Sequence, residues 1–161
     1  MDRLKDKVAV ITQAGSYFGR AVAQAYADEG AKLYLQDWEE RSDVIQTLAD
    51  QIRSNSGVEV FEGVWDITSG KETLRMTSDI IENYGKIDIL VNTAMEGGHG
   101  ILFDIREPEW DVCIDRGLKS YFLTCQYIGE EMARVGYGKI INITSIVGKM
   151  GSAGSVPWGA C

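Results

Sequence analysis

The chain has 161 residues, 45% of them apolar, and its formal net charge is −8, from 16 Lys and Arg against 24 Asp and Glu. This size and composition predict a single domain with a hydrophobic core and argue against intrinsic disorder. The acidic charge is spread without a basic cluster, which argues against nucleic acid or an anionic membrane as the main partner. No apolar run approaches the ~20 residues of a membrane span and no signal peptide is recognisable, so we expect a cytoplasmic location.

The cysteines and the single histidine offer little catalytic or metal chemistry. Cys113, Cys125 and Cys161 form no Cys-x-x-Cys pair, which argues against both zinc and disulfides. His99 lies among glycines, where a solvated loop histidine is expected, and alone it cannot form a metal cluster or a Ser-His-Asp triad. No metal site is predicted.

Strand and helix patterns alternate along the chain. Short β-branched runs predict five strands, at residues 7–12, 32–37, 58–66, 87–92 and 140–144. Apolar spacing predicts a helix from Gly19 to Ala27, helices capped by Ser42 and by Thr68, and one long helix from Pro108 to near Gly136. Alternating strands and helices build a parallel sheet with right-handed crossovers, so we predict a doubly wound α/β fold.

The long helix and the C-terminal segment carry further expectations. The inward face of the long helix is predicted to include Trp110, Ile114, Leu118, Phe122 and Met132. Residues 148–159 are rich in Gly, Ser and Ala and are predicted to form a loop. No crossover follows the fifth strand, which would lie at an open edge that favours association. Residues 1–161 are therefore expected to form one domain that is incomplete at its C-terminus.

Two segments resemble one enzyme family. Residues 12–19 read Thr-Gln-Ala-Gly-Ser-Tyr-Phe-Gly after the first strand, similar to the Thr-Gly-x-x-x-Gly-x-Gly loop of short-chain dehydrogenases/reductases. Residues 138–148 resemble the fifth strand and active-site serine of the same family. The resemblance covers essentially the whole chain. It implies a Rossmann-like sheet truncated after its fifth strand and an NAD(H)-linked oxidoreductase.

The resemblance also implies a set of cofactor-binding residues. These are Thr12, Gly15, Phe18, Gly19, Asp37, Asp66, Ile67, Asn92 and Ala94. Asp37 would accept hydrogen bonds from the adenosine ribose and repel a 2′-phosphate, which implies NAD and disfavours NADP. Gln13 stands where the family's glycine allows positive φ, Tyr17 stands where the backbone approaches phosphate, and Met95 replaces another glycine. A strand-loop-helix turn without a ligand is an equal alternative.

The catalytic positions depart further from the family. Ser145 matches the active-site serine and could orient a carbonyl group. Trp158, thirteen residues later, stands where the family has its proton-transferring tyrosine, and Gly117 stands at the position of the active-site asparagine. The family's lysine would follow Cys161. Indole N–H is a donor that does not ionise in the usable pH range, so Trp158 and Gly117 are not expected to act.

Three functions stay open on these residues. The first is an NAD-linked oxidoreductase with altered motifs, and the second is an inactive relative that serves as a partner subunit or ligand sensor. The third is a non-redox enzyme similar to halohydrin dehalogenases, which place aromatic residues where Tyr17 and Phe18 stand. The loop 95–103 is predicted to line the cleft and to favour a small apolar ligand. For a full-length protein the family implies a homo-oligomer.

Overall fold

The computed structural model describes residues 2–94 and 100–161, which contain a parallel five-stranded sheet with the order β3-β2-β1-β4-β5. The strands are β1 (Val8–Ile11), β2 (Lys32–Asp37), β3 (Val60–Val64), β4 (Ile89–Asn92) and β5 (Lys139–Asn142). The strands β2 and β3 lie on one side of β1, and β4 and β5 lie on the other. Because all five strands are parallel, their carboxyl ends meet at one edge of the sheet. This arrangement confirms the predicted doubly wound, Rossmann-like fold.

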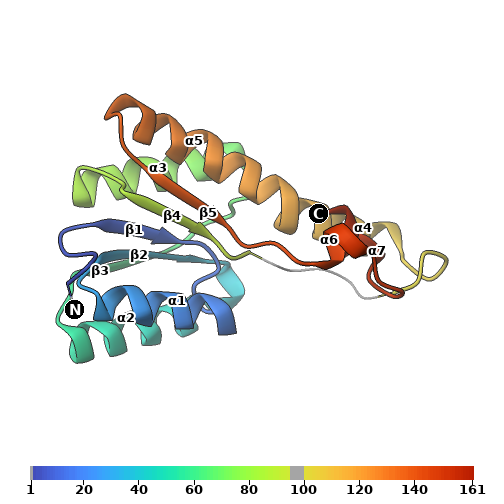
Figure 1. Cartoon of the computed structure of the whole chain (residues 1–161), viewed down its shortest axis with the longest axis horizontal. Helices are drawn as coiled ribbons and strands as arrows, with labels where there is room; N and C mark the ends of the chain where they lie inside the picture. Colours follow the sequence, from blue (N-terminus) through green and yellow to red (C-terminus); the bar gives the residue numbers. More distant parts are fainter. Residues whose placement is uncertain (1, 95–99) are drawn as a thin grey trace.

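Helices cover both faces of the sheet (Figure 1). The helices α1 (Tyr17–Asp28) and α2 (Ser42–Ser56) lie on one face, and α3 (Gly70–Tyr84) and α5 (Ser120–Arg134) lie on the other. Alternate strand residues enter separate apolar layers: Ala9 and Ile11 belong to the layer with α1 and α2, and Val10 to the layer with α3 and α5. Burial on both faces explains why the strands read as continuous apolar runs.

A smaller region extends beyond the carboxyl ends of the strands (Figure 1). It contains α4 (Glu107–Cys113), the π-helix η2 (Ile114–Lys119), α6 (Val147–Met150) and α7 (Val156–Ala160). A 3-10 helix, η1 (Glu39–Arg41), follows β2. A parallel bridge between Gly100 and Ser155 ties two parts of this region together. None of the helices in the described part of the chain is both long and apolar enough to cross a bilayer.

Three predicted helix starts are displaced by one or two residues. The helix α1 begins at Tyr17, because the Ser16 hydroxyl accepts a backbone N–H of the first turn at 3.0 Å. The helix α2 includes Ser42 as its first residue, so this serine is not its cap. Ser69 caps α3, whereas the Thr68 hydroxyl bonds to the preceding aspartate.

The predicted long helix from Pro108 to near Gly136 is confirmed in extent, because α4, η2 and α5 run without a break from Glu107 to Arg134, with a π-helical segment between the two α-helical parts. Of the predicted inward residues, Met132 is buried, whereas Trp110, Leu118 and Phe122 are exposed to 36%, 45% and 61%. The other buried residues of this helix are Cys113, Ser120, Leu123, Thr124 and Ile128. Because the wider π turn changes the phase of the side chains around the axis, a regular helical period does not identify the buried face.

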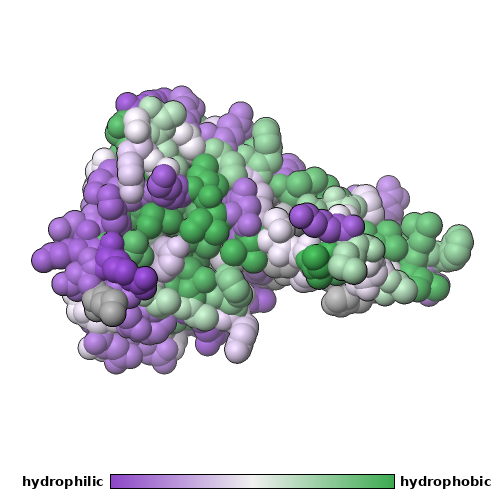
Figure 2. All heavy atoms as spheres, viewed as in Figure 1, coloured by the Kyte–Doolittle hydropathy of each residue, from purple (hydrophilic) through white to green (hydrophobic). Residues whose placement is uncertain are grey.

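The segment after β5 is wrongly predicted as loop throughout, since it contains α6 and α7. The edge position of β5 is confirmed: it pairs only with β4, and Ile140 and Ile141 are 42% and 40% exposed. Figure 2 shows hydrophobic surface in the middle of this face, over the sheet. The apolar edge is therefore open in the described structure.

Candidate functional site

The loop after β1 keeps the shape of a nucleotide-binding turn. Gln13 has φ +47°, the left-handed region that glycine prefers, as predicted for this position. Gly19 packs so closely that a Cβ there would lie 2.5 Å from the Gln13 carbonyl oxygen. The glycine at position 19 is thus needed for the approach of α1 to the loop, whereas position 13 accepts a larger residue at the cost of backbone strain.

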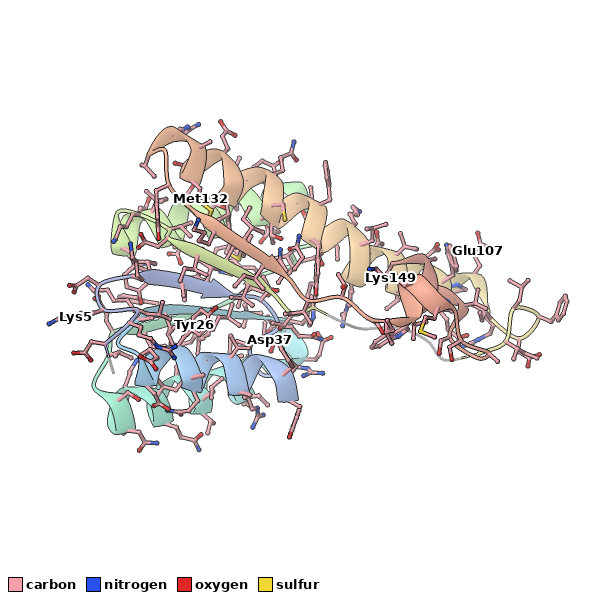
Figure 3. The ribbon with its side chains drawn as sticks, viewed as in Figure 1. Lys5, Tyr26, Asp37, Glu107, Met132 and Lys149 are labelled. Carbon is pink, nitrogen blue, oxygen red and sulfur yellow. The ribbon has the colours of Figure 1, made fainter. Side chains whose placement is uncertain are left out.

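Asp37 lies at the carboxyl end of β2, where Figure 3 shows it at the sheet edge. Its side chain is fully buried, and its two oxygens accept hydrogen bonds from the backbone N–H groups of Gly15 (2.7 Å) and Trp38 (2.9 Å). The carboxylate therefore holds the glycine loop against β2. Asp37 occupies the position of the family's ribose-binding residue, and both of its oxygens accept hydrogen bonds from the protein.

Side chains at the ends of β1 and β4 brace the same edge. The amide nitrogen of Asn92 donates to Asn142 Oδ1 at 2.9 Å, and its oxygen accepts from the Thr124 hydroxyl at 2.9 Å. Thr93 donates its backbone N–H to the Thr12 hydroxyl at 3.1 Å. The predicted cofactor residues Thr12 and Asn92 thus join three strands and α5.

Three further predicted cofactor-binding residues, Asp66, Ile67 and Ala94, lie at the end of β3 and after β4. Asp66 is exposed, and one of its oxygens accepts both the backbone N–H (2.9 Å) and the hydroxyl (2.6 Å) of Thr68. Ile67 and Ala94 are buried in one apolar cluster. Met95 and His99 lie outside the described residues.

The two aromatic residues of the glycine loop point outward. Tyr17 is 95% exposed and Phe18 is 47% exposed. Neither lines a cavity described below. In this structure they do not enclose an anion pocket of the dehalogenase type.

A cavity of about 270 Å³ brings the three predicted catalytic positions together, namely Ser145, Gly117 and Trp158. It lies at the carboxyl ends of β4 and β5. Its other lining residues are Ala94, Cys113, Leu118, Tyr121, Ile143, Thr144, Gly148, Lys149 and Cys161. The cavity is therefore mostly apolar, with hydroxyl, thiol and ammonium groups at separate points of its wall.

Two hydroxyl groups of this cavity form hydrogen bonds with the protein. The Ser145 hydroxyl accepts the Val147 N–H at 3.2 Å. The Tyr121 hydroxyl donates to the Ile143 carbonyl at 3.1 Å, and burial raises the pKa of this phenol above its ordinary value. A catalytic phenol needs a lowered pKa, so Tyr121 is a poor replacement for the tyrosine that Trp158 displaces.

Two thiols meet at the edge of the cavity. The sulfur atoms of Cys113 and Cys161 are 3.3 Å apart, and both cysteines are free. Burial, followed by the hydrogen bond to Cys113, raises the pKa of Cys161 to about 12. At neutral pH Cys161 is therefore a thiol and not a nucleophilic thiolate.

A second cavity, of about 390 Å³, lies at the carboxyl ends of β2 and β3. Its lining includes five carboxylates, Glu39, Glu40, Asp66, Glu72 and Asp115. Arg116 is the one basic residue among the described residues of this lining, and Trp38, Val64, Trp65, Thr68 and Val112 complete it. Within residues 2–94 and 100–161, no three or more His, Cys, Asp or Glu side chains are grouped so that they could hold a metal ion.

Comparison with known proteins decides the family. The sequence profile of the short chain dehydrogenases matches residues 7–161. The chain belongs to the short-chain dehydrogenase family. It is 34% identical to a 3-oxoacyl-(acyl-carrier-protein) reductase FabG of Staphylococcus epidermidis over 149 residues, covering 92% of this chain and 60% of the relative.

Two further short-chain dehydrogenases show similar coverage. An NAD-dependent glycerol dehydrogenase of Listeria innocua is 35% identical over 142 residues, covering 88% of this chain and 54% of the relative. The crystal structure of levodione reductase superposes with a TM-score of 0.92 at 28% identity, covering 98% of this chain and 61% of that one. The chain thus spans about 60% of the length of these relatives.

The cavity around Ser145 contains residues that sequence reasoning missed. Lys149 and Tyr121 line it beside Ser145, and Figure 3 shows Lys149 on α6. Lys149 lies in a Gly-rich segment that the sequence predicts as loop. Tyr121 follows the π-helix, which changes the side chains that face inward. No local sequence signal marks either residue, because both reach the cavity through tertiary packing.

Proposed function

We propose that this chain forms the NAD(H)-binding part of an oxidoreductase whose cavity cannot transfer a proton through the residue at its tyrosine position. The observation that carries the proposal is the cavity that joins Ser145, Gly117 and Trp158 at the carboxyl edge of a nucleotide-binding sheet. Ligands of open α/β sheets bind at this edge. The cofactor, when bound, supplies the hydride.

The preference for NAD over NADP is supported by charge. Asp37 ends β2, and five carboxylates line the cavity beyond it. A 2′-phosphate brought to this end would meet mostly negative charge. The relative from Listeria innocua is named NAD-dependent, which agrees with this preference.

The loss of proton transfer follows from Trp158. Its indole stands in the cavity where the family has a phenol, and an indole N–H does not ionise in the usable range. The Ser145 hydroxyl can hold a carbonyl oxygen by a hydrogen bond. Trp158, at the tyrosine position, has no ionisable group that could protonate that oxygen. The largely apolar lining favours a small apolar carbonyl compound as ligand.

A role as a partner subunit is the second candidate, and it is favoured by Trp158 and Gly117, which stand at the family's tyrosine and asparagine positions. A homo-oligomer of the full-length protein agrees with this candidate. The expected location stays cytoplasmic.

The test is calorimetric titration of the chain with NADH and NADPH. Saturable heat with NADH and weaker heat with NADPH are expected. Asp37→Asn should weaken NADH binding about tenfold, because the carboxylate that accepts the Gly15 and Trp38 N–H groups and holds the glycine loop is replaced by an uncharged amide. Asp28→Asn, an exposed change at the end of α1, is the matched control.

Turnover is measured on the same protein. With small apolar ketones, NADH oxidation should stay at the background rate. Absence of NADH binding by folded protein at millimolar concentration would refute the cofactor assignment. Steady turnover would refute the loss of proton transfer, and it would point to a donor other than Trp158.

A further inference from the structure

The second cavity is lined by two side chains, Trp38 and Arg116, that stack on each other and do not line the cavity around Ser145. Trp38 follows Asp37 directly, and both Trp38 and Asp66 line this cavity. Under the proposed function, the two aspartates mark the adenosine end of a bound dinucleotide. What lies on Trp38 therefore decides whether a base can enter.

The indole of Trp38 is enclosed. It is 3% exposed and belongs to the same buried cluster as Ile67 and Ala94. Its Nε1–H is buried, and no hydrogen-bond acceptor for it is found among the described residues. Buried donors are nearly always paired, so such a donor indicates a position that another molecule can complete. The ribose hydroxyls of a nucleoside can accept this kind of hydrogen bond.

Arg116 covers the face of this indole. Its guanidinium carbon lies 4.6 Å from the ring centre, and its Nη1 bonds to the Glu40 carboxylate at 2.7 Å. A guanidinium is planar and stacks on aromatic faces, as a nucleobase does. Arg116 and a purine would therefore compete for one surface, and Glu40, from the 3-10 helix after Trp38, retains the arginine there.

We propose that Trp38, Arg116 and Glu40 form a gate over the adenosine end of the nucleotide site, with Arg116 as the resident occupant of the indole face. The gate opens when Arg116 leaves; the base of a purine nucleoside then stacks on the face of Trp38, and its ribose accepts the Nε1–H at the edge of the ring. This inference rests on the proposed function, because it concerns the same site. The closed fraction of molecules lowers the apparent affinity for the nucleotide.

Arg116 also links the two cavities. It stands in the π-helix η2 beside Gly117, which lines the catalytic cavity. Turns of π-helix are rare and concentrate at functional sites. Release of Arg116 therefore acts on the segment that forms one wall of the catalytic cavity.

The first experiment is titration of the chain with adenosine, an uncharged probe that engages only this end of the site. Arg116→Ala should tighten adenosine binding about tenfold, because the competitor for the indole face is removed. Glu40→Gln should tighten it by a smaller factor, since Arg116 is then retained less firmly. Arg134→Ala, which breaks exposed ion pairs on α5, is the control and should leave the affinity unchanged.

A second readout reports on Trp38 directly. The indole N–H resonance of Trp38, assigned with a Trp38→Phe variant, should move downfield on addition of adenosine as the proton gains an acceptor. Trp38→Phe keeps a flat face without the donor and should weaken adenosine binding several-fold. These measurements use the wild-type chain and Trp38→Phe, so they hold even if Arg116→Ala fails to fold.

The results separate this gate from the proposed function. Unchanged or weaker adenosine binding in folded Arg116→Ala, or no shift of the Trp38 resonance, would overturn the gate. Tighter adenosine binding without any NADH binding would support the gate and remove the cofactor assignment. NADH binding by the wild type, with no effect of Arg116→Ala on either ligand, would leave the assignment in place and remove the gate. Weaker binding of 2′,5′-ADP in that variant would make Arg116 a phosphate ligand instead.

Discussion

At the scale of single residues, the glycine loop depends on the space around each position. Gln13 occupies a glycine position by adopting φ +47°, at the cost of backbone strain. Gly19 has no such freedom, because the obstacle to a side chain there is backbone that cannot move without displacing the loop. The two positions of one motif therefore differ in what they tolerate.

We predict that Gly19→Ala destabilises the protein by about 3 kcal/mol, the upper range for overpacking. The added Cβ would lie 2.5 Å from the Gln13 oxygen and 2.8 Å from the Ala14 Cα. Urea unfolding followed by circular dichroism measures the change. Gly129→Ala on α5 is the control, because its Cβ would make only an ordinary contact of 3.7 Å with Ile140. Equal stability of the two variants would contradict the packing argument.

Asp88 provides a prediction for acid pH. It is 5% exposed and accepts hydrogen bonds from the Val8 N–H at 2.9 Å and, in ion pairs, from Lys86 at 2.8 Å and Lys7 at 3.4 Å. Burial alone would favour the neutral acid, but these bonds outweigh it and hold the pKa of Asp88 below its ordinary value. The stability from this carboxylate is therefore present above pH ~4 and lost as the pH falls through its folded pKa.

We expect Asp88→Asn to lower the free energy of unfolding by about 2 kcal/mol at pH 7. The difference from wild type should shrink below pH ~4, where the wild-type carboxylate also becomes neutral. Thermal unfolding between pH 2 and 7 tests both statements. Asp111→Asn, at an exposed position of α4, should show no such dependence. A difference that stays constant with pH would exclude the electrostatic cause.

At the scale of elements, hydrogen bonds of the Asn92 side-chain amide join β4, β5 and α5 at the end of the sheet. Asn142→Ala removes the oxygen that accepts the N–H of the buried Asn92 amide, and it should destabilise the protein by about 1 kcal/mol. Asn55→Ala, exposed on α2, is the control. A double variant with Asn92→Ala should lose less than the sum of the single changes, because the pair is coupled. Strict additivity would show that this bond does not join the strands energetically.

At the scale of the whole molecule, three tyrosines link its layers: Tyr34 is buried, and Tyr84 and Tyr121 are half-buried. Tyr34 donates to Asp79 at 2.6 Å, Tyr84 to the Leu33 carbonyl at 2.6 Å, and Tyr121 to the Ile143 carbonyl at 3.1 Å. Burial is the main cause that raises the pKa of each phenol above its ordinary value. A raised folded pKa contributes stability that is complete below the unfolded pKa of ~10 and is lost as the pH rises above it.

We therefore predict that these phenols stay protonated in the folded protein at pH 11, and that the free energy of unfolding falls above pH ~10. Absorbance at 295 nm, followed together with circular dichroism, measures ionisation and unfolding on one sample. Tyr84→Phe should lose less stability between pH 9 and 11 than the wild type. Full ionisation of all tyrosines near pH 10 without unfolding would refute this.

Sequence patterns predicted the sheet better than the region beyond it. The strand Lys32–Asp37 was placed with its observed bounds, because strands buried on both faces have a continuous apolar signature. The π-helix and the helices α6 and α7 were missed, since their short segments are stabilised by contacts with one another and with α4 rather than by local propensity. The catalytic cavity lies among these missed elements.

The sequence by itself determined the fold class, the order of elements and the chemical identity of the positions at the sheet edge. It placed Asp37 at the end of β2 and Trp158 thirteen residues after Ser145, because strand periodicity and spacing are local properties. Only the tertiary structure decided that Asp37 bonds to the glycine loop, that Arg116 lies on Trp38, and that Lys149 lines the cavity. These contacts join residues distant in the chain, and their geometry depends on how the layers pack rather than on any local pattern.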